Sequence, residues 1–415
     1  MMMKSIRIGI FGLSRGYDNV DSILLNNAEI VAGCDQSEVL RERMKQKLPN
    51  IALYDSFDEF LNHDMDAVYL ANNFAEHTKF AVRALEKNIH VISECTASGT
   101  LAECVELTRA AEKSRAIYML AENYPYMLFN LEMQKVYKSG KLGKVLFAEG
   151  EYNHPVGPDD TYFIRRYEGH EKHWRFYVPA TYYITHSLGP LMCATHSNPI
   201  RVTAMPIYFP RDDRYATASY VGDNSAIITC LNDDNSVFRV TGCAHFGGHE
   251  NSYRLACENG QIENVRGDDK VMLRYDPWTT PIGEEQRQFY HPAEDVDDAV
   301  RAKKTGHAGG DYYMFKDFFQ SIREGTQPCL DAYVATRMSA VAILAHRSLM
   351  QYGVPYDVPD FRKEEDRVKY ENDRETPFWG NDGSAPTIPC CSHPEFRPSE
   401  ENLRKYREVF APEAK

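Results

Sequence analysis

The sequence predicts an α/β protein in which an N-terminal, doubly wound parallel sheet is joined to a C-terminal α+β domain with an open, mainly antiparallel sheet. Short apolar runs alternate with helix-period segments up to about residue 122, as they do in sheets built from βα units. From about residue 130, apolar and polar residues alternate along several segments, which is typical of antiparallel strands with one wet face. We therefore expect a first domain over residues 1–125, a second over 126–360 and an extended tail over 361–415.

The chain opens with a strand, a glycine turn, a helix and a second strand that ends in an acid. Residues 6–11 form an apolar run, a glycine turn begins at Gly12, and residues 17–25 carry apolar side chains at helical spacing. A second apolar run, 29–34, ends on Asp35, 23 positions after Gly12. Dinucleotide-binding folds place a carboxylate there for the ribose hydroxyls, and a small residue in the turn lets the backbone approach the pyrophosphate. The pattern predicts nucleotide binding. The full G-x-G-x-x-G motif is absent, and the alternative is a bare αβ turn with a helix-capping Asp.

The rest of the first domain continues the alternation of strands and helices. We expect strands at 51–54, 66–71, 89–92 and 117–120, and helices at 37–48, just after Asp55, at 76–87 and at 101–114. Ligands of doubly wound sheets bind beyond the C-terminal ends of the strands. The residues there are Asp35, 72–77, Glu94, Cys95, Glu122 and Asn123.

The second domain is expected to begin with a helix and to continue with a sheet. A helix over 131–139 ends at Gly140, and the expected strands are 145–152, 201–208, 225–231, 236–241 and 253–257. Two helices follow, over 311–324 and 331–352, each with a glycine at its C-terminal end. Together these segments predict a mainly antiparallel sheet with one wet face, followed by two helices.

The composition excludes several classes of partner. The formal net charge of −13 argues against nucleic acid or an anionic membrane, because both need a basic face. No apolar run approaches the roughly 18 residues of a membrane span. The N-terminus passes straight into the first strand, so we expect no signal peptide. Ten cysteines without a C-x-x-C pair indicate reduced thiols and a cytoplasmic protein, and we expect no metal centre.

The densest group of reactive side chains lies between Tyr152 and Pro190. Its members are Tyr152, His154, His170, His173, Trp174, Arg175, Tyr182, Tyr183, Thr185 and His186. Tyr183 and His186 are three residues apart, so on a helix they share one face and reach one ligand. A histidine that titrates near neutrality beside a phenol suits proton transfer at a sugar hydroxyl or carbon. From the residues alone, a packed aromatic patch around a core histidine is an equal alternative.

Two other patterns have weaker functional readings. His245 and His249 have the spacing of metal ligands, but two glycines separate them and a loop is the better interpretation. Residues 306–311 resemble a phosphate-binding glycine loop without a preceding strand. We interpret them as a turn whose Asp311 caps the following helix.

Several motifs together resemble the Gfo/Idh/MocA oxidoreductase family, and most closely its NAD-dependent glycosidase branch, typified by α-N-acetylgalactosaminidase. The motifs are Glu94-Cys95-Thr96, Ala121-Glu122-Asn123, Glu151 to His154, His173-Trp174-Arg175, Tyr183 to Pro190, Gly306 to Asp311 and Val358 to Phe361. The resemblance covers about residues 5–362. It implies a Rossmann domain followed by an α+β domain whose open sheet often forms an interface in relatives, so we expect a homo-oligomer.

The resemblance also implies roles for individual residues. NAD is expected to contact the Gly12 turn together with Ser14, Arg15, Asp35, Phe74, His77, Glu94, Cys95, Asn123 and Arg175. The sugar site is expected to contain Tyr152, Tyr183, Thr185, His186 and Tyr253, with His186 and Tyr183 as the catalytic pair. Cys95 stands where ordinary dehydrogenases of the family have the lysine of Glu-Lys-Pro, which disfavours a reaction that uses that lysine. Phe74 and Glu76 replace two tryptophans of the glycosidase branch.

Three functions are compatible with this pattern. The first is a redox-neutral glycosidase, in which NAD oxidises C3 of a glycoside, the aglycone is eliminated, water adds and the ketone is reduced again. The second is an ordinary NAD-dependent sugar or 3-keto-glycoside dehydrogenase or reductase, and the third is a catalytically inactive nucleotide or sugar sensor. Asp35 favours NAD over NADP, whose phosphate it would repel. The expected partner is a small carbohydrate.

Overall fold

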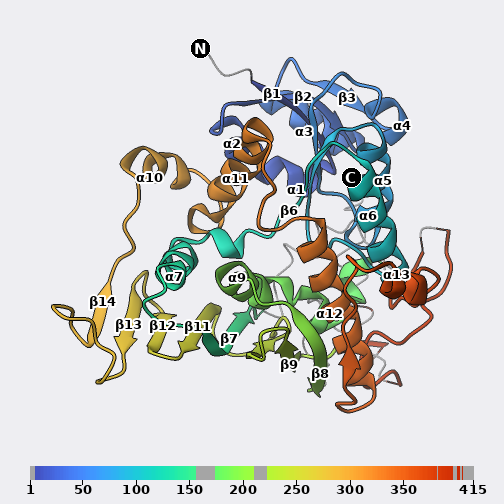
Figure 1. The fold of residues 1–415 in the computed structure, drawn as a ribbon. Coiled ribbons are helices and arrows are strands. Elements are labelled where there is room, and N and C mark those ends of the chain that lie inside the picture. The colour runs from blue at the N-terminus through green and yellow to red at the C-terminus, as the bar shows by residue number, and fades with distance from the viewer. Residues whose placement is uncertain are drawn as a thin grey trace.

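Two β-sheets with helices between them make up the computed structural model, which describes residues 5–155, 173–209, 222–380, 382–395, 400, 401 and 404. Figure 1 shows the smaller sheet at the top and the larger one at the bottom. The first is a six-stranded parallel sheet and the second a nine-stranded, mostly antiparallel sheet. The predicted fold class is confirmed.

The first sheet has the strand order of a dinucleotide-binding fold. Its strands are β1 (Ile6–Phe11), β2 (Ala28–Cys34), β3 (Ala52–Tyr54), β4 (Ala67–Leu70), β5 (His90–Ser93) and β6 (Tyr118–Leu120). They lie in the order β3-β2-β1-β4-β5-β6 with all neighbours parallel. Its helices are α1 (Leu13–Asp18), α2 (Val20–Leu24), α3 (Glu38–Lys47), α4 (Phe57–Phe60), α5 (His77–Glu86) and α6 (Leu101–Lys113). The order reverses between β1 and β4, where such sheets bind their ligands.

The turn after β1 is tighter than the sequence predicts. A five-residue loop was expected, but α1 begins at Leu13 and only Gly12 makes the turn. Gly12 has φ +92°, and a Cβ there would lie 2.3 Å from the carbonyl oxygen of Ala71. The second glycine, Gly16, lies within α1, and a Cβ on it would lie 2.4 Å from Ile10. The two glycines therefore have different functions: one reverses the chain and the other lets the helix pack on β1.

The second sheet contains more strands than the sequence indicates. Its strands are β7 (Val145–Asn153), β8 (Pro199–Ile207), β9 (Ser225–Asn232), β10 (Val237–Thr241), β11 (Glu250–Cys257), β12 (Gly260–Asn264), β13 (Val271–Tyr275), β14 (Arg287–Tyr290) and β15 (Tyr356–Asp357). They lie in the order β14-β13-β12-β11-β7-β10-β9-β8-β15. Only the β10–β7 pair is parallel among the described strands of this sheet. The four strands β12 to β15 were not predicted.

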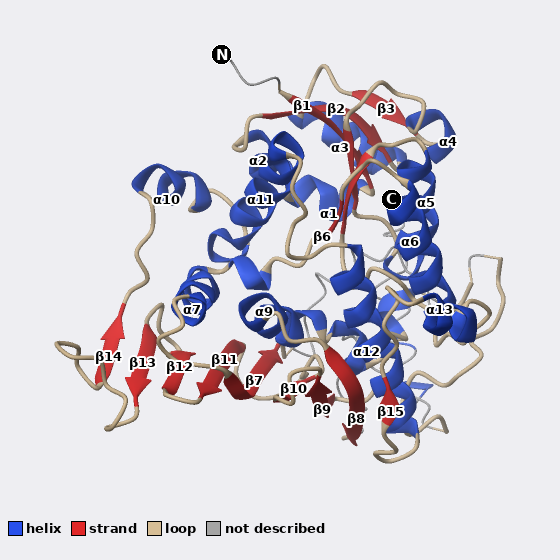
Figure 2. Ribbon diagram, viewed as in Figure 1, coloured by secondary structure: helices blue, strands red, loops and turns tan. Residues whose placement is uncertain are grey.

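Helices fill the space between the two sheets. They are α7 (Leu128–Lys138), the 3₁₀ turn η4 (Ala180–Tyr183), α9 (Thr185–Thr195), α10 (Val296–Ala302), α11 (Gly310–Glu324) and α12 (Ala332–Met350). Figure 2 shows α7, α9 and α12 on the face of the second sheet that points toward the first. Helix α9 lies close on β7, since a Cβ on Gly150 would be 2.0 Å from the carbonyl oxygen of Ser187. This contact sets the height of α9 above the sheet.

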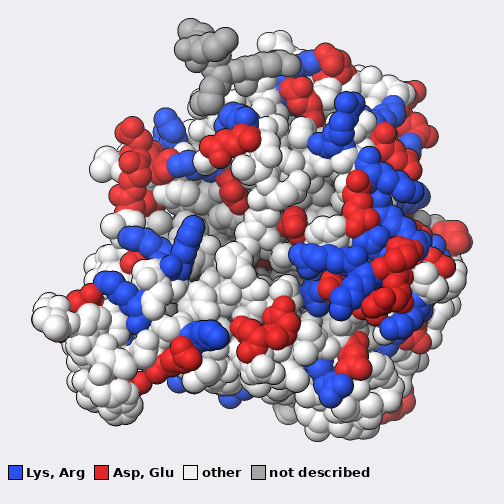
Figure 3. Space-filling view, in the orientation of Figure 1, with Lys and Arg blue, Asp and Glu red and all other residues white. Residues whose placement is uncertain are grey.

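The described part of the tail packs on the first domain and on α12. It contains the helix α13 (Glu364–Tyr370), where an extended segment was expected. Arg347 donates to both carboxylate oxygens of Asp373, at 2.8 and 2.6 Å, and Arg367 pairs with Glu112 on α6. Figure 3 shows charges of both signs gathered over this region, at the right of the view. Among the described helices, none is both long and apolar enough to cross a bilayer.

Candidate functional site

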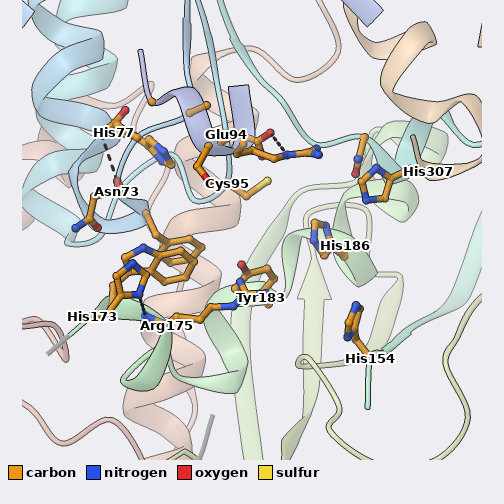
Figure 4. Close-up of a pocket in the computed structure, with 18 of the residues that line it drawn as sticks. Asn73, His77, Glu94, Cys95, His154, His173, Arg175, Tyr183, His186 and His307 are labelled. Atoms are coloured by element: carbon orange, nitrogen blue, oxygen red, sulfur yellow. Dashed lines mark hydrogen bonds and ion pairs between the residues drawn. The ribbon is translucent and has the colours of Figure 1, made fainter. Parts of the chain in front are cut away.

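A cavity of about 440 Å³ lies between the two sheets, beyond the C-terminal ends of β1, β2, β4 and β5 (Figure 4). Elements of both halves of the chain line it. From the first half come Gly12, Ser14, Arg15, Asp35, Ala71, Asn72, Asn73, Phe74, His77, Glu94, Cys95 and Asn123. From the second half come Tyr152, His154, His173, Trp174, Arg175, Tyr183, His186 and His307.

The Asp35 carboxylate is held in place at one end of the cavity. The backbone N–H of Leu13 donates to its Oδ2 at 2.8 Å, and that of Ser37 donates to its Oδ1 at 2.9 Å. A carboxylate oxygen accepts more than one hydrogen bond, so both oxygens can still receive a ribose hydroxyl. Asp35 thus lies beside the Gly12 turn in the arrangement that adenosine recognition needs. The donor set fits a dinucleotide.

Arg15 links the first domain to α11 through two acids. Its Nε donates to Glu94 Oε1 at 2.9 Å, and its terminal nitrogen lies 3.6 Å from Asp311 Oδ1. Asn123 donates to the same oxygen of Asp311 at 2.7 Å, and Tyr69 donates to Glu94. Burial alone would lower the pKa of Arg15, but the charges of Glu94, Tyr69 and Asp311 raise it well above its ordinary value. Arg15 therefore stays charged inside the protein.

His186 is held by a buried carboxylate. Its Nδ1 lies 2.8 and 2.9 Å from the two oxygens of Glu122, whose side chain has no solvent exposure. Glu122 also accepts from the Cys95 thiol at 3.1 Å and from the backbone N–H of Tyr124 at 3.2 Å. Burial alone would raise the pKa of Glu122, but the charge and hydrogen bond of His186 lower it. Tyr253 donates to the His186 carbonyl oxygen at 2.6 Å. Because Nδ1 of His186 is hydrogen-bonded to Glu122, Nε2 is the ring nitrogen that can contact a ligand.

Stacked aromatic rings form the wall beside His186. The rings of Tyr183 and His186 are 5.5 Å apart, although Tyr183 ends η4 and His186 belongs to α9, so the two do not share one helix. Phe74 stacks on Trp174 at 4.6 Å and on Tyr183 at 5.4 Å. The guanidinium of Arg175 lies over the rings of Trp174 and Tyr183, at 5.2 and 4.8 Å. Such rings offer flat apolar faces with polar edges to a ligand.

Tyr152 and His154 line the cavity on the side of the second sheet. The ring of Tyr152 meets that of His186 edge-on at 4.7 Å and that of Tyr124 at 5.3 Å. The ring of His154 lies 4.4 Å from that of His249. Burial, together with the charge of His249, lowers the pKa of His154 to about 4. His154 is therefore neutral at pH 7.

The structure brings most of the predicted site residues together around one cavity. Two predicted sugar contacts, Thr185 and Tyr253, are fully buried and are not among the residues that line it. His77 lines the cavity but is itself buried, and its Nδ1 hydrogen-bonds the carbonyl oxygen of Thr96 at 2.8 Å. His170 lies outside the described residues. The loop expected between His245 and His249 is confirmed.

The sequence did not predict that Glu122 and His307 belong to the site. Glu122 was noted at a strand end without a role. His307 belongs to the predicted turn, but Asp311 does not cap α11, whose N-cap is Gly309. The carboxylate of Asp311 instead binds His307, Asn123 and Arg15, because it points into the protein rather than back along the helix. Among the described residues, one surface group, Asp268, Asp269 and His291, has atoms close enough together to hold a metal ion.

Comparisons with known proteins agree with this architecture. Residues 6–122 match the model of the Gfo/Idh/MocA oxidoreductase family with an NAD-binding Rossmann fold, and residues 261–367 match the C-terminal domain of glycosyl hydrolase 109. A glycosyl hydrolase family 109 protein of Saccharopolyspora erythraea is 26% identical over 394 residues, which are 87% of this chain and 84% of that protein. The alpha-N-acetylgalactosaminidase of Shewanella oneidensis is 24% identical over 405 residues, or 87% of this chain and 86% of that one.

A solved structure of levoglucosan dehydrogenase in complex with NADH has the same fold. It superposes with a TM-score of 0.72 at 15% identity and covers 86% of this chain and 100% of its own. The chain therefore carries a Gfo/Idh/MocA-type NAD-binding domain together with a glycosyl hydrolase 109 C-terminal domain. The predicted family resemblance and the predicted cofactor, NAD, are confirmed.

The Asp311→Asn substitution should destabilise the protein at neutral pH, and the difference from wild type should shrink as the pH falls. Burial would raise the pKa of Asp311, but the hydrogen bond from His307 and the charge of Arg15 hold it well below its ordinary value. An unfolded Asp titrates at about 3.9, so this carboxylate stabilises the folded state above about pH 4 and stops doing so at lower pH. We expect the variant to lose about 1–3 kcal/mol of unfolding free energy at pH 7, with the gap narrowing toward pH 3. Urea denaturation at pH 7, 5, 4 and 3 measures it.

The exposed Asp297 provides the matched control for that comparison. The Asp297→Asn variant should follow the wild type at every pH, because its side chain is open to solvent. A gap between Asp311→Asn and wild type that stays constant from pH 7 to pH 3 would contradict the assignment.

Proposed function

We propose that this enzyme cleaves a glycoside by a redox-neutral cycle that uses NAD. The observation that carries the proposal is the buried Glu122–His186 pair, which faces the same cavity as the dinucleotide residues Gly12 and Asp35. The names of the relatives, glycosyl hydrolase family 109 and alpha-N-acetylgalactosaminidase, support a glycoside as substrate. The tyrosines of the cavity suit a pyranose, which has hydroxyl groups and apolar C–H faces.

Residues of the first domain would hold the cofactor. Asp35 would bind the adenosine ribose, and the Gly12 turn would admit the pyrophosphate. Arg15, charged and fixed by Glu94, would lie alongside. When bound, NAD supplies an acceptor for the C3 hydride of the sugar and returns the hydride at the end of the cycle.

His186 is the base for the proton at C2. A carbonyl group at C3 acidifies that proton, and the aglycone at C1 can then leave by elimination. The imidazole takes up the proton at Nε2, because Nδ1 donates to Glu122. The fully buried Glu122 carboxylate stabilises the imidazolium, because a charge pair is stronger when one partner is shielded from water. Water adds at C1, His186 returns the proton to C2, and Tyr183 orients the sugar hydroxyls.

Cys95 stands where ordinary dehydrogenases of this family have a lysine, and this favours the redox-neutral cycle over a dehydrogenase. No lysine is among the described residues that line the cavity, and Cys95 occupies the position in the Glu94-Cys95-Thr96 motif. Its thiol is buried and donates to Glu122, and burial raises its pKa well above the ordinary value. Cys95 therefore supports Glu122 and carries no charge of its own.

The second candidate is a sugar dehydrogenase that releases NADH. It is favoured by the shared fold with levoglucosan dehydrogenase. The two candidates differ in whether the cofactor is exchanged, and a sensor without catalysis would differ from both because it turns nothing over. Nucleotide retention and NADH stoichiometry therefore separate the three.

Substituting the proposed base should abolish turnover and leave the fold intact. The His186→Gln variant keeps an amide donor for Glu122, so the buried carboxylate is not left unpaired, but glutamine cannot take up a proton. We expect kcat to fall by about 10²–10⁴-fold, as removal of a general base does. Initial rates on 4-nitrophenyl glycosides measure it, starting with the α-N-acetylgalactosaminide. His196→Asn is the control, since His196 is exposed at the far end of α9. Unchanged kcat in His186→Gln would refute the assignment.

The purified protein should contain NAD and should not release it during turnover. We expect denaturation to liberate close to one NAD per chain, and glycoside cleavage to proceed without added cofactor. Chromatography of the released nucleotide and absorbance at 340 nm during turnover measure both quantities. One free NADH for each sugar oxidised would support the dehydrogenase instead. Bound nucleotide without turnover on a broad glycoside panel would support the sensor.

A further inference from the structure

Two cysteines and a histidine meet at the end of α9 that lies away from the cavity. Cys193 belongs to the last turn of α9, His196 ends that helix, and Cys329 lies in the segment just before α12. Figure 1 shows α9 and α12 together in the layer between the two sheets, where they contact each other. None of the three residues is among the described residues that line the cavity. The proposed cycle therefore makes no use of them.

The two thiols are in hydrogen-bond contact with each other, and Cys329 is also hydrogen-bonded to the imidazole of His196. Both cysteines are free. A disulfide can form only where two cysteine side chains approach closely and point toward each other. Side chains that share a hydrogen bond through their sulfur atoms approach in this way.

The backbone on either side of the pair is fixed. The N–H of Leu120 on β6 donates to the carbonyl oxygen of Leu330 at 2.9 Å, and the side chain of Asp331 caps α12. His196 has φ +58°, and its N–H donates to the carbonyl oxygen of Met192 at 2.8 Å. Both thiols are therefore attached to segments that the fold holds in place.

One thiol of the pair can be reached from solvent and the other cannot. Cys193 is 4% exposed, whereas Cys329 is partly exposed and His196 is exposed. Of the ten cysteines in the chain, Cys329 and Cys390 are the two that are not fully buried. A small dissolved oxidant therefore meets Cys329 first, and Cys193 reacts with Cys329 from inside the protein.

The groups around Cys329 favour its thiolate. Hydrogen bonds from Cys193 and His196 lower the pKa of Cys329 to about 6, although burial and the charge of Asp317 oppose this. The hydrogen bond to Cys329 in turn raises the pKa of His196, against its burial and the charge of Lys138. Cys329 and His196 therefore form a thiolate–imidazolium pair near neutral pH. The thiolate is the form of cysteine that attacks an oxidant.

We propose that Cys329 and Cys193 are a reversible oxidation site, in which Cys329 reacts with a peroxide and Cys193 then joins it in a disulfide. Exposed cysteines with a low pKa and a second thiol beside them react in this way. The disulfide joins α9 to the segment before α12. The site does not depend on the reaction that the cavity catalyses.

The chemistry balances with hydrogen peroxide as the oxidant. The Cys329 thiolate attacks one oxygen, the S–O bond forms, the O–O bond breaks, and the departing hydroxide takes the proton of His196 to become water. The sulfur of Cys193 then attacks the sulfenic acid of Cys329. The S–S bond forms, the S–O bond breaks, and the hydroxide leaves as water with the Cys193 proton. Two thiols are oxidised, and one peroxide is reduced to two molecules of water.

Peptide mapping of the oxidised protein tests this site. The full chain is reduced, freed of reductant, exposed to increasing amounts of hydrogen peroxide and capped with N-ethylmaleimide before a non-reducing digest. We expect the first disulfide that appears to join Cys193 and Cys329, and we expect dithiothreitol to remove it by thiol–disulfide exchange. In the Cys193→Ser variant, dimedone should instead trap the sulfenic acid of Cys329, because no neighbouring thiol remains to react with it.

Alkylation by iodoacetamide measures the thiolate directly. In the wild type, the alkylation rate of Cys329 should reach half its maximum near pH 6. The His196→Asn variant suits the left-handed backbone of this position but carries no charge. We expect it to slow the alkylation of Cys329 at pH 7 by about 3–30-fold, because less of the thiol is ionised.

Cys390 provides the matched control, because it is the other partly exposed cysteine and also hydrogen-bonds a thiol, that of Cys391. That hydrogen bond and burial raise the pKa of Cys390 well above its ordinary value. Cys390 should therefore be alkylated more slowly than Cys329 at pH 7. The Cys390→Ser variant should form the Cys193–Cys329 disulfide at the wild-type rate.

Any of three results would overturn this oxidation site. A first disulfide that joins other cysteines, or that joins two chains, would show that this pair is not the one that reacts. A Cys193–Cys329 disulfide that forms only in urea would show that the folded protein keeps the two sulfurs apart. Alkylation of Cys329 that rises only above about pH 8, as for an ordinary thiol, would show that the thiolate is not favoured. All three are measured on the wild type without a glycoside, so failure of the glycosidase cycle does not affect them.

Discussion

The burial of one carboxylate, Glu122, organises this site. Moving an ion of this kind out of water costs several kcal/mol, so its partners must be in place before the fold is stable. The partners come from three directions: His186 from α9, the Cys95 thiol from the end of β5, and the backbone N–H of Tyr124. The close approach of α9 to β7 at Gly150 allows the imidazole to reach the carboxylate. A contact between the two halves of the chain thus also orients the proposed base.

Much of the fold follows from local pattern. The parallel strands of the first sheet are short apolar runs, most of them largely buried, and all six were predicted. The strands β12 to β15 were not predicted. β12 has Ile262 as its one aliphatic side chain and β15 is only two residues long, whereas β13 is largely apolar but has only five residues. β11 to β14 pair with one another in chain order, and short strands of this kind are stabilised by cross-strand contacts that composition does not reveal. The tight turn at Gly12 was likewise set by tertiary contact, with Ala71.

The site was predictable where residues follow a strand or belong to a known motif. Asp35, Glu94, Cys95 and Asn123 lie at strand ends and all reach the cavity. The sequence could not predict which side chains of the site contact one another. The partners in the Glu122–His186 pair are 64 residues apart, and only the packing of α9 brings them together. Asp311 was predicted to cap α11, because an Asp at the start of a helix is commonly its N-cap. Its carboxylate turns inward because Arg15, Asn123 and His307 offer stronger partners than the backbone of α11.

The most direct test of the central claim is the hydrogen at C2 of the product. If His186 removes and returns that proton while NAD acts at C3, cleavage of a 4-nitrophenyl glycoside in heavy water will give a sugar that carries one deuterium at C2, because the imidazole exchanges with solvent between the two steps. Proton NMR of the released sugar measures this. A cleaved sugar that retains its original hydrogen at C2 would contradict the elimination route and the base assigned to it.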